Sequence, residues 1–123
     1  YAGISIDHVY ASKAERKSIY CKDGMYVFPL IWMEAELVIH DLSISDIRRR
    51  ETNTPVETIH VGAHTLIEQF NISRVFIENE TKDPIPLLVN FGNIKNLSLG
   101  IVETGTDKPL VVNNGEIKHQ KNL

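Results

Sequence analysis

Residues 73–91 read SRVFIENETKDPIPLLVNF, two apolar runs separated by a polar turn. Val75 and Ile77 alternate with polar or mixed neighbours, as in a strand that turns one face toward a core. Asn79 is suited to end this strand because asparagine tolerates turn geometry and bonds its own backbone. Pro86 lacks a backbone N–H, so we expect the second run to lie at the edge of its sheet.

The same pattern extends along the chain, which has 15 Ile, 10 Val and 7 Thr but only 5 Ala. Branched side chains favour strands, and turn residues recur at intervals too short for ordinary helices. We expect about eight strands, at residues 3–10, 25–32, 34–40, 56–61, 73–78, 85–91, 97–102 and 110–112. In the first strand we expect Ile4, Ile6 and His8 on one face and Val9 on the other. Residues 43–51 fit either a strand end or a helical turn.

This spacing is typical of a β-sandwich or a barrel. We predict a single antiparallel β-sandwich of jelly-roll or C2-like form over residues 1–123, with little helix. We identify no internal repeat.

Composition excludes several classes of protein. The chain has 123 residues, a formal charge of −3 and one cysteine. A disulfide framework and a Cys-rich zinc site are therefore excluded, and the charge gives no case for nucleic acid as a partner. No apolar run approaches the roughly 18 residues of a membrane span. Because the chain begins at Tyr1 and not at Met, we expect that it has been trimmed, so the lack of a signal peptide says little about export.

Two histidines, His60 and His64, are four residues apart (H-x-x-x-H). On a helix, two histidines at this spacing can bind the same zinc ion. Here Gly62 lies between them, and on a strand the two rings would be roughly 13 Å apart. We interpret them as surface or half-buried histidines and predict no metal site.

Other chemical groups give weak signals. Cys21 has no recognisable nucleophile motif around it. Glu34 and Glu36 would share a strand face at a separation that suits the paired carboxylates of a glycosidase, but any acidic pair two residues apart on a strand does so, and we interpret them as a solvated strand face. Glu78 and the nearby Glu80 and Asp83 would hold calcium only weakly. We expect no catalytic residue and no cofactor.

The only basic run is Arg48-Arg49-Arg50, which has no aromatic residue beside it in the sequence. We interpret this run as a solvated patch or as a salt-bridge partner of another subunit. Glycosylation sequons occur at Asn71, Asn79 and Asn96, where about one would arise by chance, and we draw no prediction from them.

Residues 54–92, TPVETIHVGAHTLIEQFNISRVFIENETKDPIPLLVNFG, resemble a module of tailed-phage and prophage structural proteins. The module has a segment ending in Asn, an Arg shortly after it, an apolar strand closing in Ile-x-Asn, a polar turn and a strand closing in Gly. The matching residues are Asn71, Arg74, Val75, Ile77, Asn79, Pro84, Ile85, Leu87 and Gly92. Residues 1–51 match no pattern of this kind.

The chain thus resembles prophage β-sandwich proteins of Bacillus of the XepA and YomS type, which are associated with release from lysing cells. The resemblance implies a non-enzymatic accessory protein that assembles into a ring-shaped homo-oligomer, such as a pentamer. It further implies phage structural proteins or the bacterial cell envelope as partners, synthesis in the host cytoplasm, and a virion-associated or extracellular location after lysis. We expect Tyr26, Trp32 or Phe76 to anchor subunit contacts.

Two alternatives remain open. The first is a lysis-associated exoenzyme or toxin that cuts polymers of the cell envelope, with Glu34 and Glu36 as a pair, or Cys21 and a histidine, supplying the chemistry. The second is a calcium-dependent lipid-binding sandwich.

Overall fold

The computed structural model describes residues 1–12, 29–51, 56–80, 83–105 and 110–123. In these ranges the regular structure consists of strands, and no helix that could span a membrane is found. The strands are β1 (Gly3–Ser12), β2 (Ile31–Met33), β3 (Leu37–Glu51), β4 (Ile59–Val61), β5 (Thr65–Asn79), β6 (Leu88–Asn90), β7 (Asn93–Leu99), β8 (Val102–Glu103), β9 (Val111–Asn113) and β10 (Glu116–Asn122).

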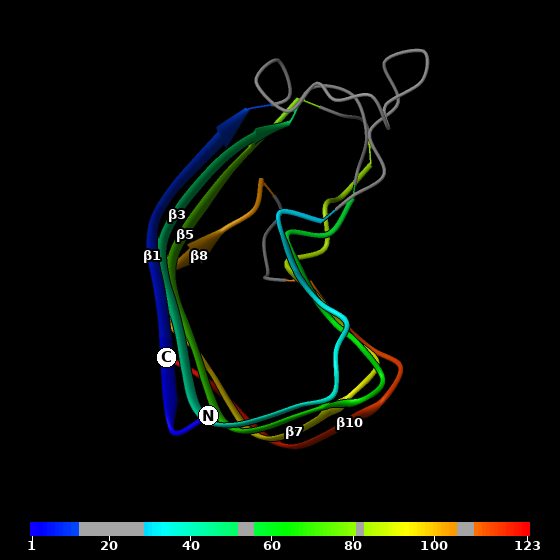
Figure 1. The fold of residues 1–123 in the computed structure, drawn as a ribbon. Helices are drawn as coiled ribbons and strands as arrows, with labels where there is room; N and C mark the ends of the chain where they lie inside the picture. Colours follow the sequence, from blue (N-terminus) through cyan, green and yellow to red (C-terminus); the bar gives the residue numbers. More distant parts are fainter. Residues whose placement is uncertain (13–28, 52–55, 81–82, 106–109) are drawn as a thin grey trace.

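The strands form two sheets in which every neighbouring pair is parallel. Sheet A has the order β1-β3-β5-β7-β10, with β8 paired to β5, and sheet B has the order β2-β4-β6-β9. The chain therefore passes from sheet A to sheet B and back, and each circuit stacks on the one before. Figure 1 looks along the stack, with β1, β3 and β5 superposed on one side. This arrangement is a parallel β-helix.

The predicted antiparallel β-sandwich is wrong. Alternation and turn spacing look alike in antiparallel and parallel sheets, so they did not reveal strand direction. Parallel neighbours need a long crossover, usually a helix. Among the described residues, the strands of sheet B and their flanking loops provide the return path between successive strands of sheet A.

The expected absence of an internal repeat is also wrong. Leu37 pairs with Thr65, 28 residues further on, Leu66 with Asn93 after 27, and Asn93 with Glu116 after 23. The paired segments of sheet A have similar sequences, and each has apolar residues at its second, fourth and seventh positions. They are GISIDHV (3–9), DLSISDI (41–47), QFNISRV (69–75) and NLSLGIV (96–102).

Stacked apolar side chains fill the space between the two sheets. Phe70 is fully buried and pairs with Leu42 on one side and Leu97 on the other. Ile67 and Ile72 lie in equivalent columns, each with an apolar partner in register on both sides. Burying one such side chain stabilises the fold by roughly 1.5–3 kcal/mol, so these columns hold successive coils together.

The long strands of sheet A bend where two consecutive residues face outward. In β5 these pairs are Glu68–Gln69 and Ser73–Arg74. Before and after each pair, buried residues alternate with outward-facing residues. At the second bend His8, Asp46 and Arg74 have φ of 56°, 55° and 56°, in three successive coils. The bend moves Val9 onto the core and leaves His8 exposed, so the predicted grouping of His8 with Ile4 and Ile6 is wrong.

The predicted edge position of the strand around Pro86 is wrong, because β6 lies between β4 and β9. Pro86 precedes β6, so its missing N–H removes no bond from the sheet. Its carbonyl oxygen accepts a hydrogen bond from the Thr58 N–H at 3.1 Å.

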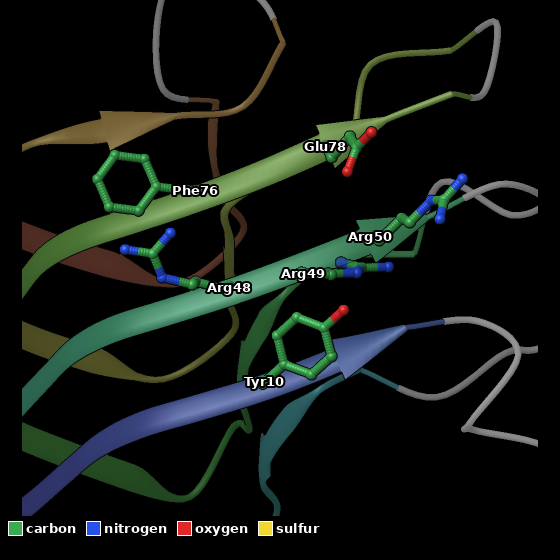
Figure 2. Close-up of a pocket in the computed structure, with 6 residues that line it drawn as sticks. All are labelled: Tyr10, Arg48, Arg49, Arg50, Phe76 and Glu78. Atoms are coloured by element: carbon green, nitrogen blue, oxygen red, sulfur yellow. The ribbon is translucent and has the colours of Figure 1, made fainter.

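The arginine run lies near the end of β3 and alternates like the rest of the strand. Arg48 and Arg50 face outward, whereas Arg49 is only 2% exposed and donates from Nη1 to Thr58 Oγ1 at 2.9 Å. Figure 2 shows the three arginines between Tyr10 and Phe76 of the flanking strands. The interpretation of all three arginines as one surface patch is therefore wrong.

Candidate binding site

Three aromatic rings lie in sequence along the outer surface of sheet B. Trp32 of β2 pairs in register with His60 of β4, and their ring centroids are 5.9 Å apart in an edge-on arrangement. Phe91 follows β6, and its ring centroid is 5.4 Å from that of His60. Trp32 is 49% and Phe91 44% exposed, so the strip offers two half-exposed aromatic side chains to a ligand.

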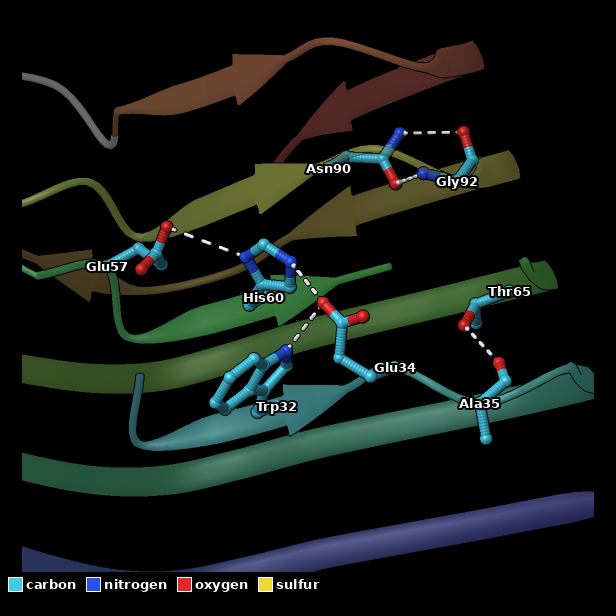
Figure 3. Close-up of polar contacts among 8 residues, drawn as sticks. All are labelled: Trp32, Glu34, Ala35, Glu57, His60, Thr65, Asn90 and Gly92. Atoms are coloured by element: carbon cyan, nitrogen blue, oxygen red, sulfur yellow. Dashed lines mark hydrogen bonds and ion pairs between the residues drawn. The ribbon is translucent and has the colours of Figure 1, made fainter. Parts of the chain in front are cut away.

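Two carboxylates hold the imidazole at the centre of this strip. Glu34 Oε1 accepts a hydrogen bond from Trp32 Nε1 at 2.8 Å and lies 3.1 Å from His60 Nε2. Glu57 Oε2 lies 3.6 Å from His60 Nδ1 (Figure 3). Both ring nitrogens of His60 thus have a carboxylate beside them, which fixes the ring between Trp32 and Phe91.

A shallow depression of about 330 Å³ lies beside the strip and is lined by Glu34, His60, Gly62, Ala63 and Phe91. Its floor is made by the turn that leads from sheet B to sheet A. Gly62 donates its N–H to the Met33 carbonyl at 2.6 Å, and a Cβ at Gly62 would lie 2.7 Å from the same oxygen. Only glycine allows this close approach of the two backbone segments.

The next turn of this type is built around Asn90 and Gly92. The buried Asn90 side chain accepts a hydrogen bond from the Gly92 N–H at 3.0 Å (Figure 3). It also donates a hydrogen bond to Asn113 Oδ1 at 3.0 Å. A Cβ at Gly92 would meet the Thr65 carbonyl oxygen and lie 2.6 Å from that of Gly62. These contacts fix the backbone on both sides of Phe91.

The sequence candidates are only partly brought together. His60 belongs to the strip, whereas His64 lies exposed in the following turn. Glu34 and Glu36 precede β3, which begins at Leu37, so the prediction that they share a strand face is wrong. Glu36 is exposed and takes no part in the network around His60. In the described ranges no group of three or more His, Cys, Asp or Glu residues is arranged to hold a metal ion.

The acidic turn proposed for calcium has other partners. Glu80 Oε1 lies 3.1 Å from Arg50 Nη2, and this hydrogen bond and charge raise the pKa of Arg50 above its ordinary value. Asn79 Nδ2 donates to the Asp83 carbonyl oxygen at 3.0 Å, and the Glu78 side chain is exposed.

The residues of the phage-like pattern lie along one coil and do not form a site. Asn71, Arg74, Ile77 and Asn79 lie on β5, whereas Pro84 and Gly92 lie in the loops on either side of β6. Of the sequon asparagines, Asn71 accepts a hydrogen bond from Gln69 Nε2 at 2.8 Å and Asn96 is exposed. Cys21 and Tyr26 are outside the described residues.

Comparison of the chain with protein-family models, with curated proteins and with solved structures found no match. The resemblance to prophage proteins is therefore untested, and the β-sandwich that it implied is replaced by a parallel β-helix.

Sequence reasoning missed Glu57 and Phe91 and placed Trp32 in a subunit contact. The sequence contains a signal for this contact, because Trp32 and His60 are 28 positions apart, which is the length of one coil. With that offset, Trp32 and His60 would have been predicted to stack.

Proposed function

We propose that this chain is a non-enzymatic binding module whose ligand is a neutral polysaccharide, held on the strip formed by Trp32, His60 and Phe91. The observation that carries the proposal is the pair of exposed aromatic rings on either side of an imidazole and a carboxylate. Sugar rings have apolar C–H faces that pack on aromatic rings, and their hydroxyl groups donate hydrogen bonds to carboxylates.

The charges of the strip favour a neutral ligand. Glu34 and Glu57 would repel a carboxylate or phosphate. Glu34 already accepts from Trp32 Nε1 and both acids lie beside His60, which reduces their attraction for a cation. Acceptor oxygens next to apolar rings suit hydroxyl groups best.

The arrangement of His60 supports binding over catalysis. A general base needs a nitrogen directed at the substrate. Each ring nitrogen of His60 instead faces a carboxylate, at 3.1 Å and 3.6 Å. The exoenzyme alternative also loses its proposed pair, since Glu36 is not part of the network around Glu34.

The test uses Trp32, the only tryptophan of the chain, as the reporter. Titration with soluble β-glucan, xylan and peptidoglycan fragments is expected to shift its fluorescence for at least one polymer. Phe91→Ala should weaken that binding about tenfold or more, as loss of a central aromatic contact does. Phe76→Ala, the same change on sheet A, is the matched control and should leave binding unchanged. The proposal would be contradicted if no polymer changed the fluorescence, or if only choline, a cation, changed it. Release of shorter saccharides would contradict the non-enzymatic part of the proposal.

The association with a phage or prophage and with host lysis is retained as a proposal whose support is the residue pattern of 54–92. It places the polysaccharide in the bacterial cell envelope. Mass spectrometry of purified virions and of the lysate after prophage induction tests it, and absence of the chain from both would contradict it.

A further inference from the structure

A depression of about 190 Å³ lies on the outer face of sheet A, away from the aromatic strip of sheet B. It is lined by Tyr10, Arg48, Arg49, Arg50, Phe76 and Glu78 (Figure 2). Tyr10, Arg48 and Phe76 are neighbours in register on β1, β3 and β5. A cation therefore lies between two aromatic side chains here, where the strip on sheet B has an imidazole and carboxylates.

Two contacts hold the Arg48 side chain in place. Its guanidinium carbon lies 5.1 Å from the Phe76 ring centroid, and its Nε lies 3.8 Å from Asp46 Oδ1. Within the described ranges this is the only ion pair of Arg48 within 4.0 Å, so its two terminal nitrogens remain available. A guanidinium group binds a carboxylate through two parallel hydrogen bonds. Because the group is already positioned, little freedom is lost when such a ligand binds.

Tyr10 adds an aromatic ring and a hydroxyl group next to this guanidinium. Its side chain is 66% exposed, and Figure 2 shows the hydroxyl group directed toward β3. The C–H face of a sugar packs on such a ring, and the phenol can donate a hydrogen bond to an oxygen. Arg48 and Tyr10 together suit a ligand that has both a carboxylate and an apolar face.

We propose that this depression is a second binding site of the chain and that it takes one carboxylate-bearing sugar residue, such as glucuronate. The carboxylate pairs with the terminal nitrogens of Arg48, and the C–H face of the sugar packs on Tyr10. Neither contact involves the strip of Trp32, His60 and Phe91. The acidic-sugar site can therefore be tested independently of the neutral-polysaccharide site.

The acidic side chains around the depression limit the charge of the ligand. Glu78 is exposed at its rim, and Glu103 pairs in register with Phe76. Arg50 is already engaged by Glu80, from Nη2 to Oε1 at 3.1 Å. A phosphate ester carries up to two negative charges, so these acids repel it more strongly than a carboxylate. The surroundings thus favour a singly charged group.

The size of the depression favours a single sugar residue. Its volume of about 190 Å³ is below the roughly 300–1,000 Å³ of a pocket for a drug-sized ligand. The site would recognise one acidic residue of a polymer and leave the rest of that polymer outside. An acidic side chain of a peptide has the carboxylate but no ring to cover Tyr10, so the exposed tyrosine favours a sugar.

The test is an NMR titration of the full chain with β-1,4-linked glucuronate oligomers. Saturable shifts of the Tyr10 ring and of the Arg48 Nε–H are expected, and glucose oligomers of the same linkage and length should not cause them. Arg48→Gln should weaken the binding about tenfold, because it removes a charged hydrogen-bond donor. Glu78→Gln should strengthen it about threefold, because it removes a like charge from the rim.

Lys121→Gln is the matched control, since it removes one positive charge from β10, elsewhere on sheet A. It should bind the glucuronate oligomers as the wild type does, and Phe91→Ala should do so as well. Unchanged melting temperatures show that the variants are folded. The proposal would be overturned by a lack of binding or by equal weakening in Arg48→Gln and Lys121→Gln. Equally tight binding of polyglutamate or of dextran sulfate would also overturn it, because the site would then select charge and not an acidic sugar.

Discussion

Replacing Phe70 with alanine tests the stacking that defines the fold. Phe70 is fully buried between Leu42 and Leu97 of the neighbouring coils. Removing such a ring costs about 3–5 kcal/mol through lost transfer energy and the cavity left behind. A chain of this length has a free energy of unfolding of roughly 6–18 kcal/mol. With an unfolding entropy of about 2.1 cal/mol/K per residue, the melting temperature should fall by about 12–19 °C.

The assay is urea unfolding followed by circular dichroism, with Phe91→Ala as the control because it removes the same ring from an exposed position. The control should cost under about 1 kcal/mol. A double-mutant cycle of Phe70→Ala with Leu97→Ala should give a coupling of about 0.5–3 kcal/mol, since the two side chains are neighbours in adjacent coils. A loss below about 1 kcal/mol at Phe70, or additive effects with Leu97, would refute the stacked arrangement.

Three further predictions concern the turns and the surface. Asn90→Ala should lower the free energy of unfolding by about 1–3 kcal/mol in the same urea assay, because it leaves the buried Gly92 N–H without its acceptor; Asn96→Ala, at an exposed position, should change little. Gly92→Ala should cost about 1–3 kcal/mol or more, since its Cβ would meet backbone oxygens that cannot move independently, and near-wild-type stability would show that the turn is looser than described. The hydrogen bond from His40 lowers the pKa of Glu68, so this carboxylate adds stability above its unfolded pKa that is lost as the pH falls through its folded pKa. An NMR titration should give a midpoint for Glu68 below the ordinary glutamate value that rises in His40→Ala, and an unchanged midpoint would contradict this assignment.

Local patterning identified strands but not their direction. β1 and the placement of Ile4 and Ile6 on the same face were predicted correctly, because they depend only on alternation within a few residues. The face of His8 was wrong since a positive φ shifts the alternation by one residue, and no glycine marks that bend. Such a shift is visible only when the segment is aligned with its neighbours in the stack, where Asp46 and Arg74 have the same conformation.

The candidate site was missed for a related reason. Trp32, His60 and Phe91 come from three coils, and no short motif connects residues that are 28 and 31 positions apart. Glu34 was paired with Glu36 because both fitted an expected strand, yet that segment is the turn before β3. Proximity between coils depends on the repeat length, which local patterns of charge and hydropathy do not contain.

In this fold each outward position on a strand continues as a column across the coils. The side chains of one column therefore come from residues about 28 positions apart in the sequence. A single substitution changes only one side chain of the column. The column on sheet B joins Trp32 to His60, whereas that on sheet A joins Tyr10, Arg48, Phe76 and Glu103. Figure 1 shows the backbone of these two sheets on different sides of the coil. The buried apolar side chains form the core between them. Binding of the neutral polysaccharide would thus use the column on sheet B alone, so Phe76→Ala on sheet A should leave that binding intact.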